Sequence, residues 1–343
     1  MTPRERLLAA INHQEVRPVP YEFCFLDDIA KRMDQYFGNQ DWRERCNTSF
    51  VSCSPVKFPS RQAIPNDPTR KTDMFGGVWR IDGLADHLEQ AAMPEADLSL
   101  LHLPDLASLR SSAHLEECRK YLAAHSDRAS FASVWGSGLY ETLWNLRGFE
   151  GSLFDAAGDE GFYSELTSRV AQFVDAVLDI ALELPVDIVG FGDDMGDQCG
   201  VTIGPDRWRQ FYKSHWARFC SKAHAAGKKV FLHSCGSVAS IIPDLIEVGI
   251  DILDPIQPEA AGMNPYELKR KYGDRITLCG GLGSQSTIPF GTPDSIRKEI
   301  SHLVHEVGRG GGYILKPAKA IRNETPLENA IAVFEAFTKQ ESL

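Results

Sequence analysis

A buried β-strand is predicted at Lys228-Lys229-Val230-Phe231-Leu232-His233-Ser234-Cys235-Gly236, where three apolar residues run into a histidine, a cysteine and a glycine. Side chains alternate faces along a strand, so His233 and Cys235 point to the same side. An imidazole and a thiol placed in this way can bind a borderline cation such as Zn²⁺. A small buried cysteine beside a hydrogen-bonded histidine would leave the same pattern. The pair alone does not distinguish a metal site from a core cysteine and histidine, so the rest of the sequence is needed to decide.

Further strands are predicted on both sides of this stretch, and helices with clear start and stop signals separate them. Residues 205–226, for example, form a predicted helix that begins with a proline and ends before Gly227. Strands that alternate with capped helices indicate βαβ units and a parallel sheet. Seven such strands are predicted near residues 19, 130, 187, 229, 251, 276 and 312, and an eighth is placed within 51–56.

Eight parallel strands would close a TIM-type (βα)₈ barrel, so we predict an α/β fold of this class. A doubly wound open sheet is the rival, but no G-x-G-x-x-G follows the first predicted strand. Prolines and the Gly76-Gly77 pair predict a β-hairpin within 47–83, with residues 75–81 as an antiparallel strand. We therefore treat residues 1–343 as one barrel domain, with an N-terminal helical and hairpin extension in 1–125 and regular βα repeats in 126–343.

The composition narrows the partners that the chain is expected to have. It has 343 residues, of which 43% are hydrophobic and 24% charged, as in an ordinary globular enzyme. The net charge of −11 disfavours nucleic acid and anionic membranes as partners. No apolar run approaches the roughly 18 residues of a membrane span. Eight cysteines without disulfide spacing, and an N-terminus without an apolar signal core, lead us to expect a cytoplasmic protein.

Polar side chains follow nearly every predicted strand. Catalytic groups of a TIM-type barrel gather at the carboxyl ends of its strands. Because six or seven polar strand ends would converge on one mouth, the sequence predicts a buried active site there. The candidates are the catalytic Asp193, Asp194, Lys316 and Lys319, the substrate-binding Glu22, Trp135, Tyr140, Gln257, Gln285 and Arg322, and the metal ligands His233 and Cys235.

Several longer motifs contain these residues. They are Arg4-Glu5-Arg6-Leu7, Arg17-Pro18-Val19-Pro20, Gly192-Asp193-Asp194-Met195-Gly196, His233-Ser234-Cys235-Gly236-Ser237, Asp254-Pro255-Ile256-Gln257-Pro258, Gly280-Gly281-Leu282-Gly283-Ser284-Gln285, Gly311-Gly312-Tyr313-Ile314-Leu315 and Thr325-Pro326-Leu327-Glu328-Asn329. Together they resemble the uroporphyrinogen decarboxylase superfamily, especially its cobalamin-linked methyltransferases. The resemblance spans nearly the whole chain. It implies a barrel with zinc at its mouth and methyl transfer to or from a corrinoid.

Two departures from the family pattern bear on the reaction. Uroporphyrinogen decarboxylases would carry an arginine-rich, substrate-binding segment after the first strand, whereas residues 23–28 contain no arginine. The methyltransferases would place a second zinc cysteine beyond the last strand, where this chain has Lys319. A protonated lysine cannot ligate zinc, so the third ligand would be Asp194, Glu22 or a substrate atom. Cys279 is a further candidate, although its place inside a strand favours the core.

The first function that these residues allow is methyl transfer. His233 and Cys235 would bind zinc, Asp194 would be a third ligand or a proton acceptor, and Gln257 and Gln285 would orient the substrate. The methyl group would pass between a small O-, S- or N-methylated substrate, or a thiol, and a corrinoid. Because the chain has no additional cobalamin-binding signature, a separate protein would carry the corrinoid.

The second function is metal-free decarboxylase or lyase chemistry on a small carboxylate. Lys316, Lys319, Arg322 and Arg147 would bind the substrate, and His233 would move protons. Solvated lysines at the rim of the mouth are the plainer interpretation of the two lysines. A non-catalytic binding barrel is a third class. A small-molecule ligand is expected in each case, and a homodimer is the assembly that we expect.

Overall fold

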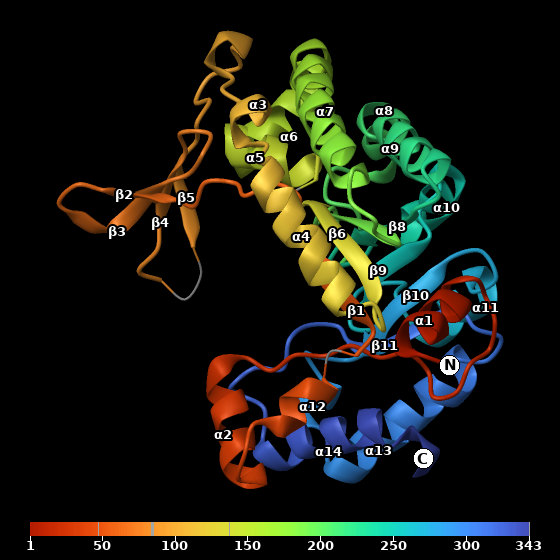
Figure 1. The fold of residues 1–343 in the computed structure, drawn as a ribbon. Helices are drawn as coiled ribbons and strands as arrows, with labels where there is room; N and C mark the ends of the chain where they lie inside the picture. The colour runs from red at the N-terminus through yellow and green to blue at the C-terminus, as the bar shows by residue number, and fades with distance from the viewer. Residues whose placement is uncertain (47, 84–85, 137, 343) are drawn as a thin grey trace.

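A curled parallel sheet forms the centre of the computed structural model, which describes residues 1–46, 48–83, 86–136 and 138–342 (Figure 1). Its strands follow the order β1-β6-β7-β8-β9-β10-β11, so neighbours along the chain are neighbours in the sheet. Every pairing is parallel, as successive βα units require. The strands are β1 (Phe50–Cys53), β6 (Ala129–Trp135), β7 (Ile188–Gly192), β8 (Lys229–His233), β9 (Ile252–Ile256), β10 (Thr277–Leu282) and β11 (Tyr313–Pro317).

The segment predicted as the first strand lies beside β11 without forming a regular strand. Tyr21 makes a parallel bridge to Leu315. The Glu22 N–H donates to the Leu315 carbonyl, and the Leu315 N–H donates to the Pro20 carbonyl. Ser49 Oγ, just before β1, donates to the Tyr21 carbonyl at 2.8 Å. The prediction of an α/β fold with a parallel sheet is therefore confirmed, while its closure into a regular eight-stranded barrel stays a prediction.

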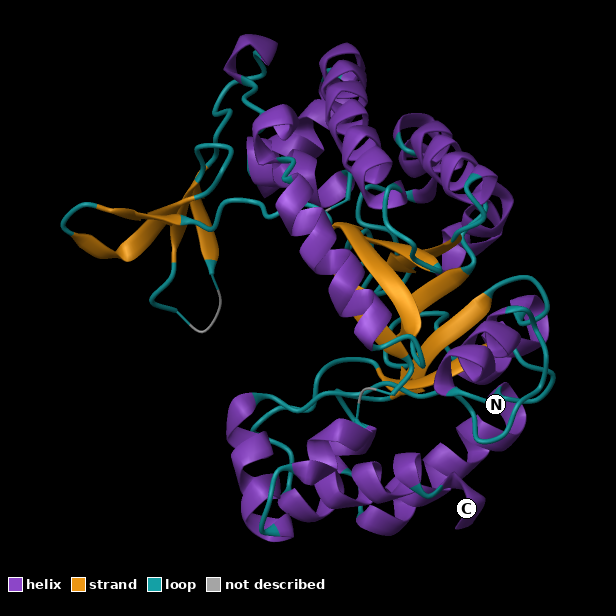
Figure 2. Cartoon of the chain, viewed as in Figure 1, coloured by secondary structure: helices purple, strands orange, loops and turns teal. Residues whose placement is uncertain are grey.

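Helices pack against the outside of the sheet (Figure 2). Thr2 begins the first helix through a capping box, because its side chain accepts from the Glu5 N–H and the Glu5 carboxylate accepts from the Thr2 N–H. The α-helices are α1 (Pro3–Ile11), α2 (Asp27–Phe37), α3 (Leu106–Leu109), α4 (Ser112–Ala124), α5 (Tyr140–Arg147), α6 (Phe149–Gly158), α7 (Glu160–Leu182), α8 (Pro205–Phe211), α9 (Lys213–Ala225), α10 (Ile242–Val248), α11 (Pro265–Tyr272), α12 (Thr287–Phe290), α13 (Pro293–His302) and α14 (Leu327–Thr338). Short helical turns are η1 (Asp41–Arg45), η2 (Leu98–Leu100), η3 (Ala239–Ile241), η4 (Leu303–Val307) and η5 (Gln340–Ser342).

Two hydrophobic clusters hold these layers together. The larger one lies between the sheet and its helices. The smaller one gathers side chains from the early parts of the strands and from α1: Leu7, Ile11, Ala129, Ile188, Phe231, Ile252, Cys279 and Ile314. Cys279 is therefore a core residue, and burial raises the pKa of its thiol well above the ordinary value. A thiol that resists ionisation in this way is a poor metal ligand.

A small antiparallel sheet projects from the body of the molecule (Figure 1). Its order is β2-β3-β4-β5, with β2 (Gln62–Ile64), β3 (Asp67–Thr72), β4 (Val78–Arg80) and β5 (His87–Gln90). The strand predicted at 75–81 is β4, which pairs antiparallel with β3 and β5. This four-stranded sheet is thus larger than the predicted hairpin. Across the described residues, no helix combines the length and the apolar character that a membrane span needs.

Candidate active site

Three side chains that follow neighbouring strands bring ligand atoms together at the carboxyl edge of the sheet. Asp194 follows β7, while His233 ends β8 and Cys235 follows it. The register pairs Gly192 with His233, which places the two strand ends side by side. One oxygen of Asp194, one nitrogen of His233 and the sulfur of Cys235 all lie within 4.8 Å of one another. Cys235 Sγ is 3.4 Å and Asp194 Oδ1 is 3.7 Å from His233 Nε2.

The other nitrogen of His233 faces a buried carboxylate. His233 Nδ1 lies 2.5 Å from Oδ2 of Asp254, which comes from the neighbouring strand β9 and is fully buried. Oδ1 of Asp254 accepts from Lys316 Nζ at 2.7 Å. A carboxylate that holds the proton on one ring nitrogen leaves the other nitrogen for a metal, and this arrangement is common behind metal-binding histidines.

The charges of this group reinforce one another. Burial alone would raise the pKa of Asp254, but Lys316 and His233 hold it well below its usual range. Burial alone would lower the pKa of His233, but the hydrogen bonds with Asp254 and Cys235 outweigh it and raise the pKa to about 10. Burial alone would also lower the pKa of the Lys316 ammonium, but the charge of Asp254 holds the pKa of this lysine above its ordinary value. A metal that binds at His233 therefore has to displace a proton.

Glu141, which was not among the predicted site residues, supports Asp194 from the start of α5. The Asp194 N–H donates to Glu141 Oε2 at 3.0 Å, while Asp194 Oδ1 accepts from the Cys235 N–H at 2.8 Å. Burial raises the pKa of Glu141 to about 7, against the hydrogen bond from Asp194. Only its position in the sequence could have indicated this role. Glu141 lies a few residues beyond the end of β6 and therefore near the carboxyl edge of the sheet.

Asp193 lies outside the cluster, in contrast to the prediction that it is catalytic. It is fully buried. Its carboxylate accepts from the backbone N–H groups of Leu139, Tyr140 and Glu141 at 3.1, 3.2 and 3.0 Å. Three backbone donors at the start of a helix satisfy this carboxylate, as an N-terminal cap does. Asp193 is therefore a structural residue that fixes α5 near Asp194.

Three other predicted substrate contacts are buried side chains in the structure. Trp135 is buried, and its indole N–H donates to Thr142 Oγ1 at 2.9 Å. Tyr140 is buried beside the ring of Tyr212. Arg147 is buried in an ion pair with Asp155 at 2.6 Å, so its guanidinium is not available to a carboxylate ligand. The position of these residues near strand ends did not reveal the contacts, because the partner residues lie farther along the chain.

Gln257 lies next to the metal-ligand loop. It is 1% exposed, and its Oε1 accepts from the Gly236 N–H at 3.1 Å. Its Nε2 has no hydrogen-bond partner within the part of the chain that the structure describes. An unpaired buried donor is unfavourable, so a substrate oxygen is a natural partner for it.

The remaining candidates divide between the interior and the rim. Burial raises the pKa of the Glu22 carboxyl to about 8, although the Lys316 charge favours ionisation. Gln285, Lys319 and Arg322 are exposed and line a separate pocket of about 280 Å³. Lys319 and Arg322 form no ion pair among the described residues. The rim interpretation of Lys319 therefore agrees with its exposure, whereas Lys316 belongs to the interior.

The Asp194–His233–Cys235 cluster fits a zinc ion by its chemistry. Zinc binds imidazole nitrogen, thiolate sulfur and carboxylate oxygen, and catalytic zinc takes three protein ligands with one position open. The cluster offers one donor of each kind. The third donor is the carboxylate of Asp194, one of the ligands that the sequence predicts in place of a cysteine at position 319.

Comparison with known proteins identifies the family. The model of the uroporphyrinogen decarboxylase (URO-D) family matches residues 83–340. Uroporphyrinogen decarboxylases of Neisseria meningitidis and Neisseria gonorrhoeae are each 20% identical to this chain, over 266 and 267 residues, and the matches cover 74% of this chain and 71% of theirs. A methyltransferase from Methanosarcina mazei superposes with a TM-score of 0.70 at 19% identity and 99% coverage of both chains, which shows a shared fold. With most of its length matched by the family model, and the strand-end motifs in place, the chain belongs to the uroporphyrinogen decarboxylase family.

Proposed function

We propose that this protein is a metal-assisted methyltransferase that moves a methyl group between a small methylated compound, or a thiol, and a corrinoid carried by a separate protein. The observation that carries the proposal is the convergence of Asp194, His233 and Cys235 within 4.8 Å. The fold shared with the Methanosarcina mazei methyltransferase supports the same direction.

The residues around the cluster would have distinct roles. Asp194, His233 and Cys235 would hold the zinc ion. Asp254 would keep the proton on His233 Nδ1, and Lys316 would keep Asp254 ionised. Zinc, when bound, lowers the pKa of a coordinated thiol and so supplies a thiolate at neutral pH. Gln257 would donate its free N–H group to a substrate oxygen and orient the substrate.

The corrinoid would approach over the carboxyl edge of the sheet, where the cluster lies. In transfer to a thiol, the corrinoid would supply the methyl group and keep the electron pair of the broken carbon–cobalt bond. The thiolate would form the new sulfur–carbon bond with its own electron pair, and the thiol proton would leave to solvent. The open side of the mouth would accordingly face the corrinoid-carrying partner.

A metal-free decarboxylase or lyase is the second candidate, and Glu22 is the observation that favours it. With a pKa of about 8, the Glu22 carboxyl holds its proton at neutral pH and can donate it. Lys316 is protonated and paired with Asp254, so it cannot act as the base. Lys319 and Arg322 would then bind the substrate carboxylate at the rim. The decarboxylases among the relatives agree with this alternative.

Metal content and methyl transfer from free methylcobalamin test the proposal together. Protein purified without chelator is expected to hold about one zinc ion per chain, and 2-mercaptoethanol serves as the thiol probe. His233→Ala should lose both the zinc and the thiol-dependent demethylation, which is followed by absorbance. His302→Ala, an exposed histidine on α13, is the control and should retain both. Folded wild-type protein without metal, or equal rates in His233→Ala, would favour the lyase instead.

A further inference from the structure

A second site is suggested by a basic pocket of about 540 Å³ on the side of the sheet where β10 and β11 begin, away from the cluster at the carboxyl edge. Six of its lining side chains are lysine, arginine or histidine, and a single one is a carboxylate, Asp274. The whole chain carries a net charge of −11, so this concentration of positive charge does not follow from composition. We call this site the basic pocket; it is lined by His13, Lys269, Arg270, Lys271, Gly273, Asp274, Arg275, Arg309 and Gly310.

Three separate segments meet closely to form the basic pocket. His13 Nδ1 donates to the Gly273 carbonyl at 3.0 Å, which joins the end of α1 to the end of α11. A Cβ on Gly273 would lie 2.3 Å from Lys269 Cδ, so the lysine stem folds back over this glycine. A Cβ on Gly312 would lie 2.6 Å from both the Gly273 carbonyl and His13 Nδ1. The three segments are therefore closely packed at Gly273 and Gly312, where a larger residue would need its neighbours to move.

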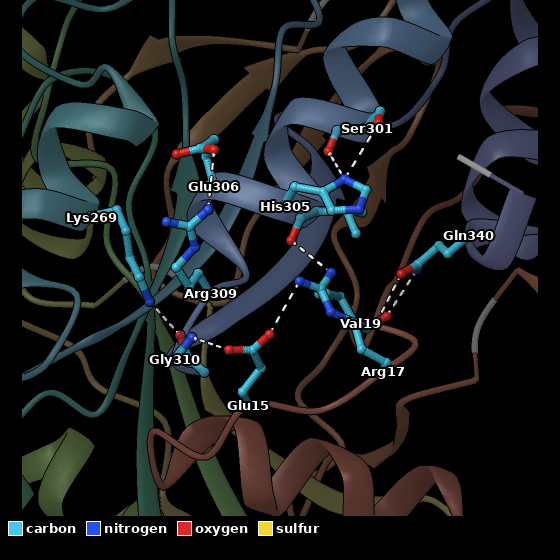
Figure 3. Close-up of polar contacts among 12 residues, drawn as sticks. Glu15, Arg17, Val19, Lys269, Ser301, His305, Glu306, Arg309, Gly310 and Gln340 are labelled. Carbon is cyan, nitrogen blue, oxygen red and sulfur yellow. Dashed lines mark hydrogen bonds and ion pairs between the residues drawn. The ribbon is translucent and has the colours of Figure 1, made fainter.

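Lys269 places a half-buried positive charge in the pocket without a carboxylate partner. Its Nζ donates to the Gly311 carbonyl, beside Gly310 in Figure 3. It forms no ion pair among the described residues. Burial lowers the pKa of the Lys269 ammonium, and the charges of Glu15 and Asp274 offset this only in part. A partly desolvated charge without a counterion is unfavourable, and a bound anion would relieve it.

The nearby carboxylates are engaged elsewhere. Figure 3 shows that Glu15 accepts from the Gly310 N–H, at 2.9 Å, and pairs with Arg17 at 3.3 Å. Arg309 pairs with Glu306 at 3.5 Å on the surface. Exposed pairs of this kind contribute little, so an anion of higher charge can replace them.

The exposed cations of the basic pocket have weak carboxylate partners or none among the described residues. Arg275 pairs only loosely with Asp274, at 3.7 Å, and both side chains are exposed. Arg270 and Lys271 form no ion pair within the described ranges of the chain. Most of the positive charge of the pocket is thus available to a ligand.

The end of helix α11 explains part of this charge. Lys269, Arg270 and Lys271 occupy its last turn, where cations stabilise the negative end of the helix dipole. Arg275 and Arg309 come from segments outside the helix, so the dipole does not account for them. The dipole counts as about half a negative charge, Asp274 and Glu306 as one each, and Glu15 is neutralised by Arg17. The five lysines and arginines then leave a local charge of about +2.5.

We propose that the basic pocket binds a small molecule that carries a chain of two or three phosphate groups. Arginine forks bind phosphate oxygens in pairs, and cations spread over one pocket favour an anion with several charges. The volume of about 540 Å³ lies within the range of small-ligand sites. The net charge of the chain disfavours an extended nucleic acid as the ligand. The site is separate from the proposed methyl-transfer centre and does not depend on it.

Calorimetric titration of the full chain with inorganic tripolyphosphate tests this proposal. We expect saturable binding of one tripolyphosphate per chain, at least about tenfold tighter than orthophosphate. The double variant Arg270→Gln/Arg309→Gln should weaken binding by about tenfold or more. Its control, Arg119→Gln/Arg169→Gln, removes the same charge from exposed positions on α4 and α7 and should leave the affinity unchanged. Far-UV circular dichroism verifies that all variants fold.

Three results would overturn the proposal. The first is an equal loss of affinity in the control variant, which would mean that tripolyphosphate responds to total charge. The second is unsaturable binding, or tripolyphosphate and orthophosphate of equal affinity. The third is tighter binding of a single-stranded oligonucleotide that competes with tripolyphosphate, which would assign the pocket to a polymer.

Discussion

The two nitrogens of His233 face different partners, and the proposed site depends on this division. Nδ1 faces the buried carboxylate of Asp254, while Nε2 faces Cys235 and Asp194. A ring whose proton is fixed on Nδ1 presents the Nε2 lone pair to a metal. Lys316 completes the group by pairing with the other oxygen of Asp254.

Asp254→Asn should lower the zinc affinity by about 10- to 100-fold, because an amide stabilises the Nδ1 proton less than a carboxylate does. Competition with a chromophoric chelator measures the affinity. Asp251→Asn is a matched control on the same part of the chain, because Asp251 Oδ2 pairs with His224 Nε2 at 2.8 Å away from the cluster. Equal affinities in Asp254→Asn and the wild type would remove Asp254 from the site.

Glu22 makes stability depend on pH. Burial raises its pKa from 4.5 to about 8, so folded protein retains a proton that the unfolded chain releases between these values. The stability contributed by protonated Glu22 is present below the unfolded pKa and is lost as pH rises towards 8. Glu22→Gln cannot ionise, so the free energy of unfolding of the wild type should fall by about 4 kcal/mol more than that of the variant across this range.

Urea unfolding at a series of pH values measures this difference. Glu324→Gln, at an exposed position, should follow the wild-type profile and serves as the control. Parallel profiles for Glu22→Gln and the wild type would show that Glu22 is not desolvated in the folded protein.

Sequence reasoning found the donors of the cluster but not their supports. His233 and Cys235 share a face because strands alternate, and Asp194 follows the neighbouring strand. Asp193 and Asp194 are adjacent in the sequence, but Asp193 caps α5 whereas Asp194 joins the cluster with His233 and Cys235. The sequence did not indicate which of the two would join the cluster. Glu141 was missed because its role depends on how α5 is placed, and Asp193 sets this placement through hydrogen bonds across the fold.

At the scale of the elements, buried strands were the easiest to predict. The strand predicted within 228–236 is β8 (Lys229–His233). Strands β3 and β5 were missed because their sequences, Asp67–Thr72 and His87–Gln90, are rich in polar residues and lack apolar alternation. They are joined to the small sheet partly by charge, since Arg70 pairs with Glu89 at 2.5 Å.

Strand β7 carries a glycine whose replacement should be costly. A Cβ on Gly190 would lie 1.9 Å from Cζ of Phe131 on the neighbouring strand β6. Gly190→Ala should therefore lower the free energy of unfolding by about 1–3 kcal/mol, as overpacked cores do. Urea unfolding measures the loss, and Gly200→Ala, with no atom within 4 Å of the added Cβ, is the control. Equal midpoints for the two variants would contradict the packing of Phe131 against β7.

At the scale of the whole molecule, the first residues of the chain hold its distant parts together. Leu7 of α1 packs with residues from the strands of the sheet. Arg4 pairs with Asp187 at 2.7 Å, and Tyr21 bridges to Leu315 near the other end of the sequence. The sequence predicted a helical N-terminal extension but not this role, because an amphipathic helix does not reveal which surface it covers.

Leu7→Ala should lower the free energy of unfolding by about 2–4 kcal/mol, because Leu7 is fully buried and the cavity cannot be refilled by its neighbours. Leu8 is partly buried against the same cluster, so Leu8→Ala should cause a smaller loss. Thermal and urea unfolding of both variants provide the comparison. A larger loss in Leu8→Ala would mean that α1 packs through its other face.

We propose that Asp194, His233 and Cys235 offer a metal one oxygen, one nitrogen and one sulfur ligand at the carboxyl edge of the sheet. Titration with Co²⁺, a spectroscopic stand-in for Zn²⁺, tests this ligand set through the absorption spectrum of the protein. We predict saturation at about one ion per chain, with a thiolate-to-cobalt charge-transfer band that is lost in Cys235→Ser and retained in the variant of an exposed cysteine, Cys199→Ser. A band that survives in Cys235→Ser, or folded protein that binds no cobalt, would rule out this ligand set.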